Sequence, residues 1–304
     1  MTVLRSRPRL VLLGVALAAV VALVVVMLAS SDDKPAAQDD PHAIPNLPAA
    51  KMKSVLAATE AASTATSKAE LVSQGRALFN DPAVAKRGET CGGCHTLGTS
   101  NESVGLITHT DAGGKVLFAR DPPSLVGAAK TAPMRWTGDV PTLQQQVVNT
   151  ILNHFQNGAT QPQSKTAEQA AALVAYISTI RPPTSSFDQG TMSPAAIRGE
   201  TLFQGKGACI ACHGGPLFTD NKMHNTLVPQ RNGWNDPGAT VAGFPGNFNT
   251  PQLRDVRNTA PYMHNGVFRN LRDVIDFYNA RSSIAPLHLT PQEIDDLVAY
   301  LDAL

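Results

Sequence analysis

The chain has 304 residues, with 25 lysines and arginines against 24 aspartates and glutamates, which gives a formal net charge of +1. This balance gives no reason to expect a nucleic-acid partner, because such proteins carry a basic surface. The part that follows the N-terminal segment is long enough for two domains of about 110 residues each.

The N-terminal segment predicts that the rest of the chain is exported. Three arginines in the first nine residues precede an unbroken apolar run over residues 10–29, which has the length of a membrane-spanning helix. The basic flank places that end in the cytoplasm. We expect residues 1–30 to be an uncleaved anchor in the inner membrane, and the alternative is a cleaved signal peptide. In both cases the remainder lies in the periplasm.

Residues 31–70 have the composition of a linker, rich in Pro, Ala and Asp, without an apolar period. Residues 51–70 are rich in alanine, serine and threonine and can form a helix. They offer few bulky side chains to bury.

The four cysteines of the chain all lie in two Cys-x-x-Cys-His motifs. A zinc site, a thioredoxin-like thiol pair and a covalently attached c-type haem all use Cys-x-x-Cys, but the haem motif alone requires the histidine that follows. In that motif both thiols bind the haem and the histidine ligates its iron. We therefore expect two c-type haems, attached at Cys91 and Cys94 with ligand His95, and at Cys209 and Cys212 with ligand His213.

The two halves of the chain are copies of one another. The segment 121–150 aligns without a gap to the segment 249–278, at an offset of 128 residues, and the shared positions include Thr-Ala-Pro, a glycine and a leucine. Each copy reads as a helix, the haem motif, a proline-rich turn and two further helices. We predict an all-α fold of two tandem cytochrome c-like domains, 71–182 and 183–304, preceded by the N-terminal membrane-spanning or signal helix.

The sequence NTPQLRDVRNTAPYMHNGVFRNLRDVIDFYN, which follows the second haem motif, resembles the bacterial di-haem cytochrome c peroxidases and their MauG-like relatives. The resemblance covers roughly residues 71–304 and is more specific in the C-terminal half. It implies a peroxide-reacting haem in the N-terminal domain and a second haem that stores or relays oxidising equivalents.

Positions that differ between the repeats indicate how the haems differ. Tyr278 stands where typical cytochrome c peroxidases have a methionine ligand and MauG-like proteins have tyrosine, so the resemblance implies a His/Tyr second haem. A phenolate stabilises ferric iron. The equivalent residue of the first half is Thr150, a poor ligand, which leaves the distal side of the first haem open for peroxide. The alternative for Tyr278 is a core tyrosine.

Trp136 and His264 share another repeat position. The resemblance implies that Trp136 lies between the haems as an electron relay, a role compatible with packing between the domains. We expect His264 to contact a haem propionate or the backbone.

Cleavage of peroxide requires a group that accepts a proton and returns it. The family pattern has glutamine ten residues after the tryptophan, which Gln146 matches, and glutamate twenty residues after it, where this chain has Gln156. His154 lies on the same predicted helix and can titrate near neutral pH. It is either the missing base or a half-buried helix residue.

Two metal interactions follow from the resemblance. His109, in a segment that we expect to be a loop, matches approximately a histidine that caps the first haem in the resting state. An oxygen of Asp121 and the carbonyls of Thr259 and Pro261 match the ligands of a calcium ion between the domains. The alternative for Asp121 is an ordinary Asp-Pro turn.

Two functions remain open at this point. The first is a di-haem peroxidase that reacts with hydrogen peroxide and takes electrons from a small redox protein or a protein substrate. The second is a membrane-tethered electron-transfer cytochrome without oxygen chemistry. The contrast between Thr150 and Tyr278 favours the enzyme, whereas the missing glutamate favours the carrier. A homodimer is left open.

Overall fold

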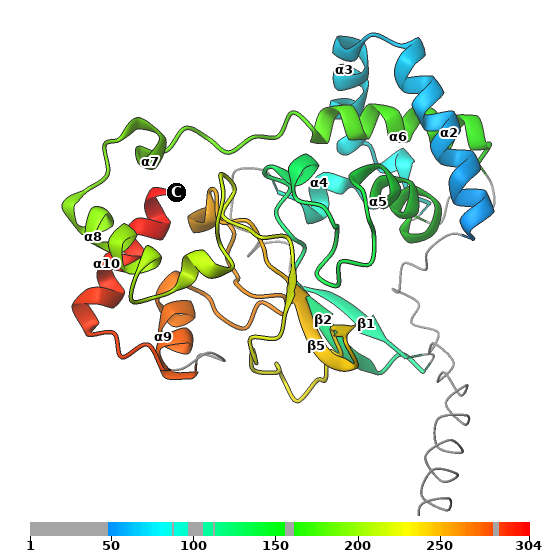
Figure 1. Cartoon of the computed structure of the whole chain (residues 1–304). Coiled ribbons are helices and arrows are strands. Elements are labelled where there is room, and N and C mark those ends of the chain that lie inside the picture. Colours follow the sequence, from blue (N-terminus) through cyan, green and yellow to red (C-terminus); the bar gives the residue numbers. More distant parts are fainter. Residues whose placement is uncertain (1–47, 87, 97–105, 112, 156–160, 282–285) are drawn as a thin grey trace, which may run out of the picture. The chain divides into compact units, whose positions relative to one another are not determined.

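The computed structural model describes residues 48–86, 88–96, 106–111, 113–155, 161–281 and 286–304. Pro41–Leu304 forms one compact unit, and most of its regular structure is helical (Figure 1). The predicted anchor at residues 10–29 lies outside the described residues. Within the described residues, no helix has the length and apolar composition needed to cross a membrane.

Several helices of the N-terminal half begin at polar capping residues, whereas α2 and α6 follow Pro48 and Pro162 without a side-chain cap. The side chain of Ser67 accepts a hydrogen bond from the backbone N–H of Glu70, at the start of α3, and Thr142 does the same for Gln145 at the start of α5. Such caps satisfy N–H groups that have no partner within the helix. The helical elements of this half are α2 (Ala49–Ala65), α3 (Lys68–Phe79), η1 (Pro82–Val84), α4 (Cys91–Cys94), η3 (Ala128–Lys130), α5 (Leu143–Asn149), η4 (Thr150–His154) and α6 (Gln163–Ile177).

The C-terminal half follows the same rules. Ser193 caps α8 and Pro194 occupies its first turn, as the sequence predicts. Thr290 and Glu293 form a reciprocal capping box at the start of α10. The helical elements of this half are α7 (Ser186–Gln189), α8 (Pro194–Gln204), η6 (Cys209–Ala211), η7 (Val256–Asn258), α9 (Leu271–Arg281) and α10 (Pro291–Ala303).

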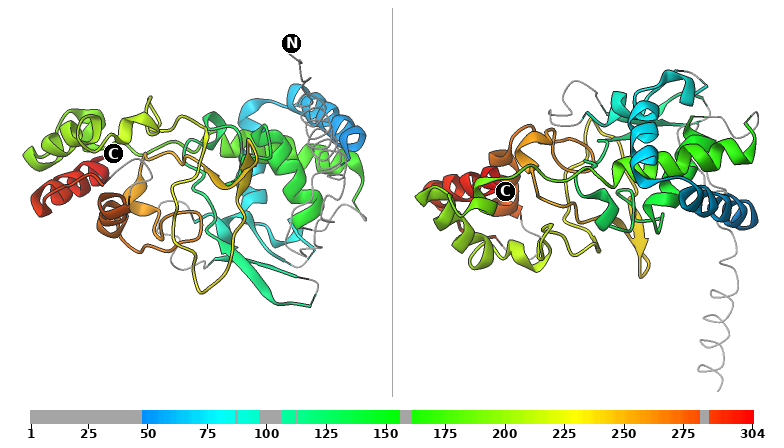
Figure 2. Two further views of the ribbon diagram at one scale, coloured as in Figure 1. Left: turned by 60° about the horizontal axis from the view of Figure 1, so that its bottom comes forward. Right: turned by 90° about the horizontal axis from the view of Figure 1, so that it is seen from above.

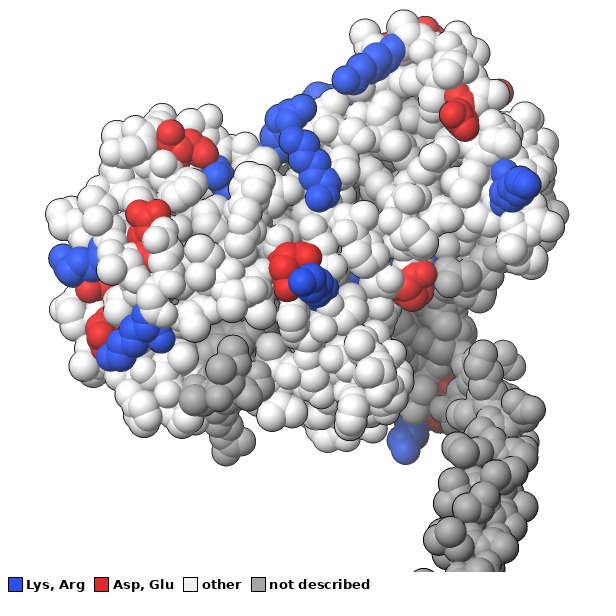
Figure 3. Space-filling model, in the orientation of Figure 1, with Lys and Arg blue, Asp and Glu red and all other residues white. Residues whose placement is uncertain are grey.

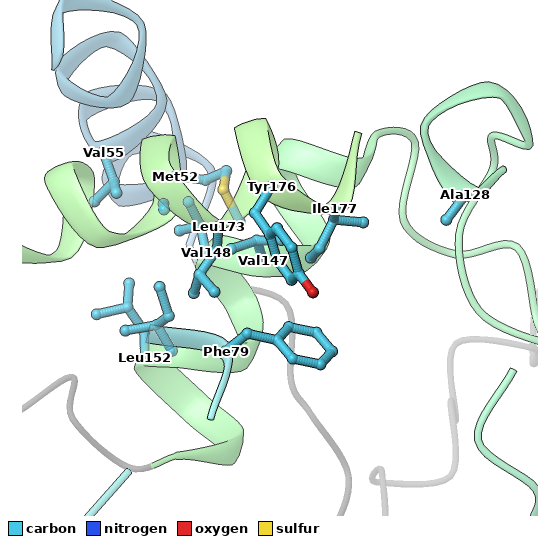
Figure 4. Packing of buried hydrophobic residues seen from close by; sticks show 12 residues of the cluster. Met52, Val55, Phe79, Ala128, Val147, Val148, Leu152, Leu173, Tyr176 and Ile177 are labelled. Atoms are coloured by element: carbon cyan, nitrogen blue, oxygen red, sulfur yellow. The ribbon is translucent and has the colours of Figure 1, made fainter. Parts of the chain in front are cut away.

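The second half of the predicted linker is helix α2, and this helix belongs to the N-terminal core. Its Met52 and Val55 are buried, and Figure 4 shows them beside Val148 and Leu173. Leu56 packs against the same cluster and Thr59 is buried as well, so one face of this alanine-rich helix docks on the core, because residues three and four apart share a face.

Among the described residues, two large apolar clusters that share no residue form most of the interior, one in each half, and two smaller clusters add to the N-terminal half. Both views of Figure 2 likewise show two groups of helices, α2–α6 and α7–α10, at separate places in the unit. The clusters confirm a fold with two domains. The first is built on Met52, Val55, Phe79, Ala128, Val147, Val148, Ile151, Leu152, Ala170, Leu173, Tyr176 and Ile177, and the second on Phe203, Phe218, Val256, Leu271, Ile275, Leu289, Ile294, Leu297, Tyr300, Leu301 and Leu304.

The predicted internal repeat extends to the way the helices pack. A Cβ atom on Gly75 of α3 would lie 2.0 Å from a backbone oxygen of α6, and a Cβ atom on Gly199 of α8 would lie 2.0 Å from a backbone oxygen of α10. Only glycine permits these two close crossings. Beside them Phe79 meets Tyr176 edge to face, and Phe203 meets Tyr300 in the same way, both with ring centroids 5.3 Å apart.

The proline-rich turns repeat as well. Arg135 and Met263 both have φ +69°, and the glycines three residues later, Gly138 and Gly266, have φ +61° and +60°. A non-glycine residue in the left-handed region is uncommon. Its occurrence at the same place in both halves indicates that the turn itself, not the side chain, sets this backbone conformation.

The all-α prediction is incomplete, because two small antiparallel sheets accompany the helices. One joins β1 (Ile107–Thr110) to β2 (Val116–Arg120), and the other has the order β3-β5-β4, from Met223–His224, Phe244–Asn249 and Ala239–Val241. β1 and β2 are rich in β-branched and aromatic residues, which favour strands. Both sheets lie between a haem motif and the following helix, a region where the halves differ in sequence.

The surface carries charges of both signs. On the face in Figure 3, Lys and Arg side chains alternate with Asp and Glu among uncharged residues. Ion pairs also occur among the described residues, such as that of Lys206 with Glu293.

Candidate haem sites and the interface between the halves

Each Cys-x-x-Cys-His motif forms a single tight turn. The backbone N–H of His95 donates to the carbonyl of Cys91 at 2.8 Å, and that of His213 donates to the carbonyl of Cys209, also at 2.8 Å. All four cysteines are half-buried, and none of them forms a disulfide. Each turn therefore brings two thiols and an imidazole close together.

The geometry disfavours the two alternatives to haem. Burial raises the pKa of Cys91 and of Cys209 to about 11, whereas a redox-active thiol has a lowered pKa. Cys91 packs against the first core and Cys209 against the second, so the two pairs do not converge on one zinc ion. Within the described part of the chain, the one three-residue group with metal-ligand spacing joins Cys212 to Asp220 and His224.

Both motif histidines are oriented as haem ligands. Nδ1 of His95 lies 3.1 Å from the carbonyl oxygen of Pro123, and Nδ1 of His213 lies 2.9 Å from that of Phe218. A histidine that donates from Nδ1 to a carbonyl presents Nε2 as the ligand atom. Burial also lowers the pKa of His95 to about 4, which favours the neutral form that binds a metal. The residues thus fit a haem in each half.

Tyr278 faces the second motif. It lies on α9, and burial raises its pKa to about 12, with a smaller opposite contribution from a hydrogen bond with Thr226. Electrostatic interactions with Cys209 and Cys212 also contribute to this shift, so the phenol lies near the cysteines of this motif. This position is compatible with the predicted distal ligand.

Thr150, the equivalent of Tyr278, has its hydroxyl engaged by its own helix in the first half. Its hydroxyl donates to the carbonyl of Gln146 at 2.9 Å and accepts from Nε2 of the same residue at 3.2 Å. The residue begins η4, a five-residue π-helix that continues α5. Such π turns often occur at functional sites.

Gln146, Thr150 and His154 are half-buried along one side of α5 and η4, while Val147 and Ile151 point into the core. An electrostatic interaction with His154 contributes to the low pKa of His95, which places the two histidines in one site. The polar helix face predicted from sequence therefore exists beside the first motif, although Gln156 lies outside the described residues.

His109 lies in a strand, not in the loop that we expected. It belongs to β1, pairs with Phe118 of β2, and stacks on that ring with centroids 4.4 Å apart. The alternation of Ile107, Thr108, His109 and Thr110 is a strand signal that the helical interpretation of this domain overlooked.

Trp136 and His264 meet at the interface between the halves. Nε1 of Trp136 donates to the carbonyl of Asp121 at 2.6 Å, and its ring contacts that of His264. His264 is 3% exposed and stacks on Phe248 with centroids 3.5 Å apart. Its backbone carbonyl accepts a hydrogen bond from the N–H of Asp121 at 2.8 Å. Nε2 of its side chain is buried without a hydrogen-bond partner, so the expected side-chain bond to a propionate or to the backbone stays a prediction.

A buried ion pair near this interface was not predicted. Nε and Nη2 of Arg120 donate to the two oxygens of Asp236 at 2.8 and 2.7 Å, and Nε2 of His264 lies 4.0 Å from the same carboxylate. Burial lowers the pKa of His264 to about 4, although Asp236 opposes this shift. Sequence could not reveal this pair, since its members are 116 residues apart.

Arg135 is the second residue that sequence reasoning missed. Its Nε donates to Oε1 of Gln146 at 2.7 Å and its Nη1 to Asp139 at 2.8 Å. Burial lowers its pKa and Asp139 opposes the shift, but a guanidinium remains charged in proteins. A signal was present, because the equivalent residue of the other repeat is the uncharged Met263.

The expected calcium ligands lie close to this interface. Asp121 is 5% exposed, and its backbone N–H donates to the carbonyl of His264. His264 follows Pro261 by three residues, so Pro261 lies in the same segment. Thr259 closes the turn that η7 begins, with its hydroxyl donating to the carbonyl of Val256 at 2.9 Å.

Comparisons with known proteins agree with this arrangement. Residues 69–169 match the model for di-haem cytochrome c peroxidase, and residues 196–304 match that for cytochrome c. Cytochrome-c peroxidase IdrP1 of Denitromonas iodatirespirans is 30% identical over 310 residues, covering 78% of this chain and 81% of that protein. Methylamine utilization protein MauG of Methylorubrum extorquens is 30% identical over 282 residues, covering 77% and 78%.

Solved structures share the fold. A MauG-like protein associated with microbial copper homeostasis aligns with a TM-score of 0.61 at 24% identity, covering 77% of this chain and 88% of that one. The diheme peroxidase BthA of Burkholderia thailandensis aligns with a TM-score of 0.60 at 22% identity, covering 77% and 86%. With its two motifs, its two cores and these relatives, the chain belongs to the bacterial di-haem cytochrome c peroxidase and MauG family, and is a peroxidase-like oxidoreductase that carries haem.

Proposed function

We propose that this protein reduces hydrogen peroxide at a c-type haem attached to Cys91 and Cys94, with electrons relayed through a second haem attached to Cys209 and Cys212. One observation carries the proposal: equivalent helix positions hold Tyr278 in one half and Thr150 in the other. The phenol is a ligand for iron, whereas the threonine hydroxyl is engaged by Gln146. The first haem thus keeps a side on which peroxide can bind.

Haem iron supplies the redox chemistry when bound, and the residues of the chain bind, orient and move protons. Peroxide takes up two electrons and two protons and leaves as two water molecules. His154 accepts the proton of the bound peroxide and returns it to the leaving oxygen, because an imidazole nitrogen can both accept and donate a proton. Gln146 has no titratable group and orients the oxygens through its amide.

The second half stores oxidising equivalents in this proposal. A tyrosine ligand stabilises ferric iron and lowers the potential relative to a thioether ligand. Trp136 connects the halves, since its ring contacts that of His264 and its carbonyl accepts a hydrogen bond from the N–H of Asn249. The electron donor is a small redox protein or a protein substrate that is itself oxidised.

A calcium ion between the halves is part of the same proposal, and the internal repeat supports it. Nδ2 of Asn249 donates to the carbonyl of Pro133 at 2.8 Å. The repeat equivalents of Asn249 and Pro133 are Asp121 and Pro261. The amide donor of Asn249 is thus replaced by a carboxylate, which cannot donate, while the carbonyl acceptor is kept. Two oxygen acceptors at the corresponding positions suit a cation, and calcium takes such ligands together with further carbonyls like that of Thr259.

We further propose that the protein works in the periplasm, held at the inner membrane by residues 10–29. The apolar run, its basic flank and the covalent haem motifs support this location.

Stopped-flow mixing of the holoprotein with hydrogen peroxide tests the function. We expect the first haem to react with hydrogen peroxide in this experiment. The reaction occurs either in the ferric protein or after a one-electron reduction that releases His109, if this residue caps the iron in the resting state. A ferric spectrum with one high-spin and one low-spin haem would accompany this reactivity. Two low-spin haems that react in neither state would instead identify an electron-transfer cytochrome, the function that the glutamine at position 156 favours.

A further inference from the structure

We propose that Arg135 is a positioning residue of the peroxide site, which fixes the amide of Gln146 so that it donates a hydrogen bond to an anionic ligand on the first haem. This inference rests on the proposed function. It also makes the first haem site selective for anions that accept hydrogen bonds, the deprotonated form of peroxide among them.

The backbone of this turn does not depend on the arginine. Arg135 and Met263 occupy the same repeat position with the same φ of +69°, and an isolated β-bridge flanks each of them, Met134 with Val140 and Tyr262 with Phe268. The side chain at this position can therefore differ while the turn persists. The half with the open haem side has a cation here, and the half with the tyrosine has a thioether.

The chemistry of the contact fixes the orientation of the amide. Arginine has N–H donors and no acceptor. The bond of 2.7 Å from Nε of Arg135 therefore requires the oxygen of Gln146 at that end, and the NH2 group must point the other way. One N–H of this NH2 group donates to the hydroxyl of Thr150 at 3.2 Å. We assign the hydrogen bond of the second N–H to the ligand on the haem.

Asp139 anchors the arginine without competing for this task. Its carboxylate binds Nη1 of Arg135, on the opposite side of the guanidinium from the Nε–Gln146 bond, and also accepts from the hydroxyl of Thr137 at 2.6 Å. Two attachment points leave the guanidinium little freedom to rotate, so the bond to Gln146 is held in place. Bonds from charged donors are stronger than neutral ones.

Donors thus dominate the described part of this site, in which Arg135 and Gln146 present N–H groups and His154 is the proton acceptor. Fluoride separates these roles. It enters as an anion at neutral pH and needs no proton acceptor, whereas hydrogen peroxide must lose a proton to bind as an anion. Fluoride affinity should therefore depend on Arg135 and Gln146 but not on His154.

The experiment is an optical titration of the holoprotein with fluoride, in the oxidation state that reacts with peroxide. Arg135→Met, which introduces the residue of the other repeat, should weaken fluoride binding by about tenfold to a hundredfold, the loss expected for one hydrogen bond to a charged group. Gln146→Leu should have a similar effect. The double variant should bind no more weakly than Gln146→Leu, because Arg135 acts through that residue. Lys130→Met is the matched control, since it removes an exposed charge of the same half.

Several results would overturn the inference. Wild-type affinity in Arg135→Met would do so, as would strictly additive losses in the double variant. A changed potential of the first haem with unchanged fluoride affinity would assign Arg135 to a haem propionate instead. If the wild-type protein neither binds fluoride nor reacts with peroxide, the proposed function and this inference both fail. If the wild-type protein does both and Arg135→Met binds fluoride equally well, only the inference fails. If Arg135→Met loses haem, comparison of Gln146→Leu with wild type still decides whether the amide acts on the ligand.

Discussion

The rings of Trp136 and His264 meet edge to face, with centroids 6.5 Å apart and planes at 70°. The two residues occupy the same position in the two repeats, so the halves face each other through equivalent surfaces. Two backbone hydrogen bonds between the halves are also equivalent under the repeat. The N–H of Asn249 donates to the carbonyl of Trp136 at 2.7 Å, and the N–H of Asp121 donates to the carbonyl of His264 at 2.8 Å. One shared backbone arrangement thus presents different side chains to the two haem sites.

Attachment of the first haem depends on its two thiols. Changing both Cys91 and Cys94 to Ser should remove one covalent haem and leave the other, because the two motifs pack against separate cores. Haem staining after denaturing electrophoresis, together with the haem-to-protein ratio, measures this. Two covalent haems per variant chain would disprove attachment at this motif.

Tyr278→Met should raise the potential of the second haem by on the order of hundreds of millivolts, since the axial ligand sets the potential over a wide range. A spectroelectrochemical titration measures the shift. Tyr262→Phe is the control, because it removes another phenol hydroxyl from the same half. That hydroxyl donates to the carbonyl of Arg257 at 3.4 Å. An unchanged potential and spectrum in Tyr278→Met would show that Tyr278 is not an iron ligand.

His154→Ala should slow the reaction with peroxide by at least about a hundredfold, the usual loss of a general acid–base group, while the haem content stays unchanged. Gln156→Glu in the same background should restore part of the rate by supplying a carboxylate. His288→Ala removes an exposed histidine and should react like wild type. A wild-type rate in His154→Ala would make His154 a packing residue only.

The Arg120–Asp236 pair should contribute strongly to stability. Asp236→Asn leaves the guanidinium of Arg120 without its anion in a buried setting, and should lower the free energy of unfolding by about 3 kcal/mol or more. Denaturant unfolding measures this. Asp295→Asn, which removes the exposed partner of Arg272, should have a much smaller effect. Equal effects of the two substitutions would contradict the prediction.

The same pair should make the protein sensitive to acid. Burial alone would raise the pKa of Asp236, but the hydrogen bonds and charge of Arg120 lower it below its usual value. The folded state therefore keeps this carboxylate ionised where the unfolded state already binds a proton. Its contribution is present above about pH 4 and is lost as the pH falls through the folded pKa. Asp236→Asn should flatten this part of the stability profile.

Removal of calcium should loosen the interface between the halves. A chelator should lower the melting temperature of the wild-type protein, because the buried carboxylate of Asp121 would lose its proposed cation. Added calcium should restore it, whereas magnesium should not. Asp121→Ala should melt at one temperature with or without chelator. A wild-type protein that does not respond to the chelator would refute the site.

The sequence by itself determined the chemistry and the repeat. The two Cys-x-x-Cys-His motifs are local, and a single turn of chain suffices to bring the two thiols and the histidine of each motif together. The alignment of 121–150 with 249–278 predicted two equivalent helical domains, and it singled out Tyr278 against Thr150. Local spacing and internal symmetry survive folding, so sequence reveals them.

Only the tertiary structure decided which distant residues meet. The pair of Arg120 with Asp236 and the contact of Trp136 with His264 join residues more than a hundred positions apart, and no periodicity encodes such pairs. The strand of His109 and the bond from Arg135 to Gln146 likewise depend on how a turn and a hairpin pack against the helices. Hydrogen bonds and ion pairs act over a few ångströms, and the fold alone sets those distances.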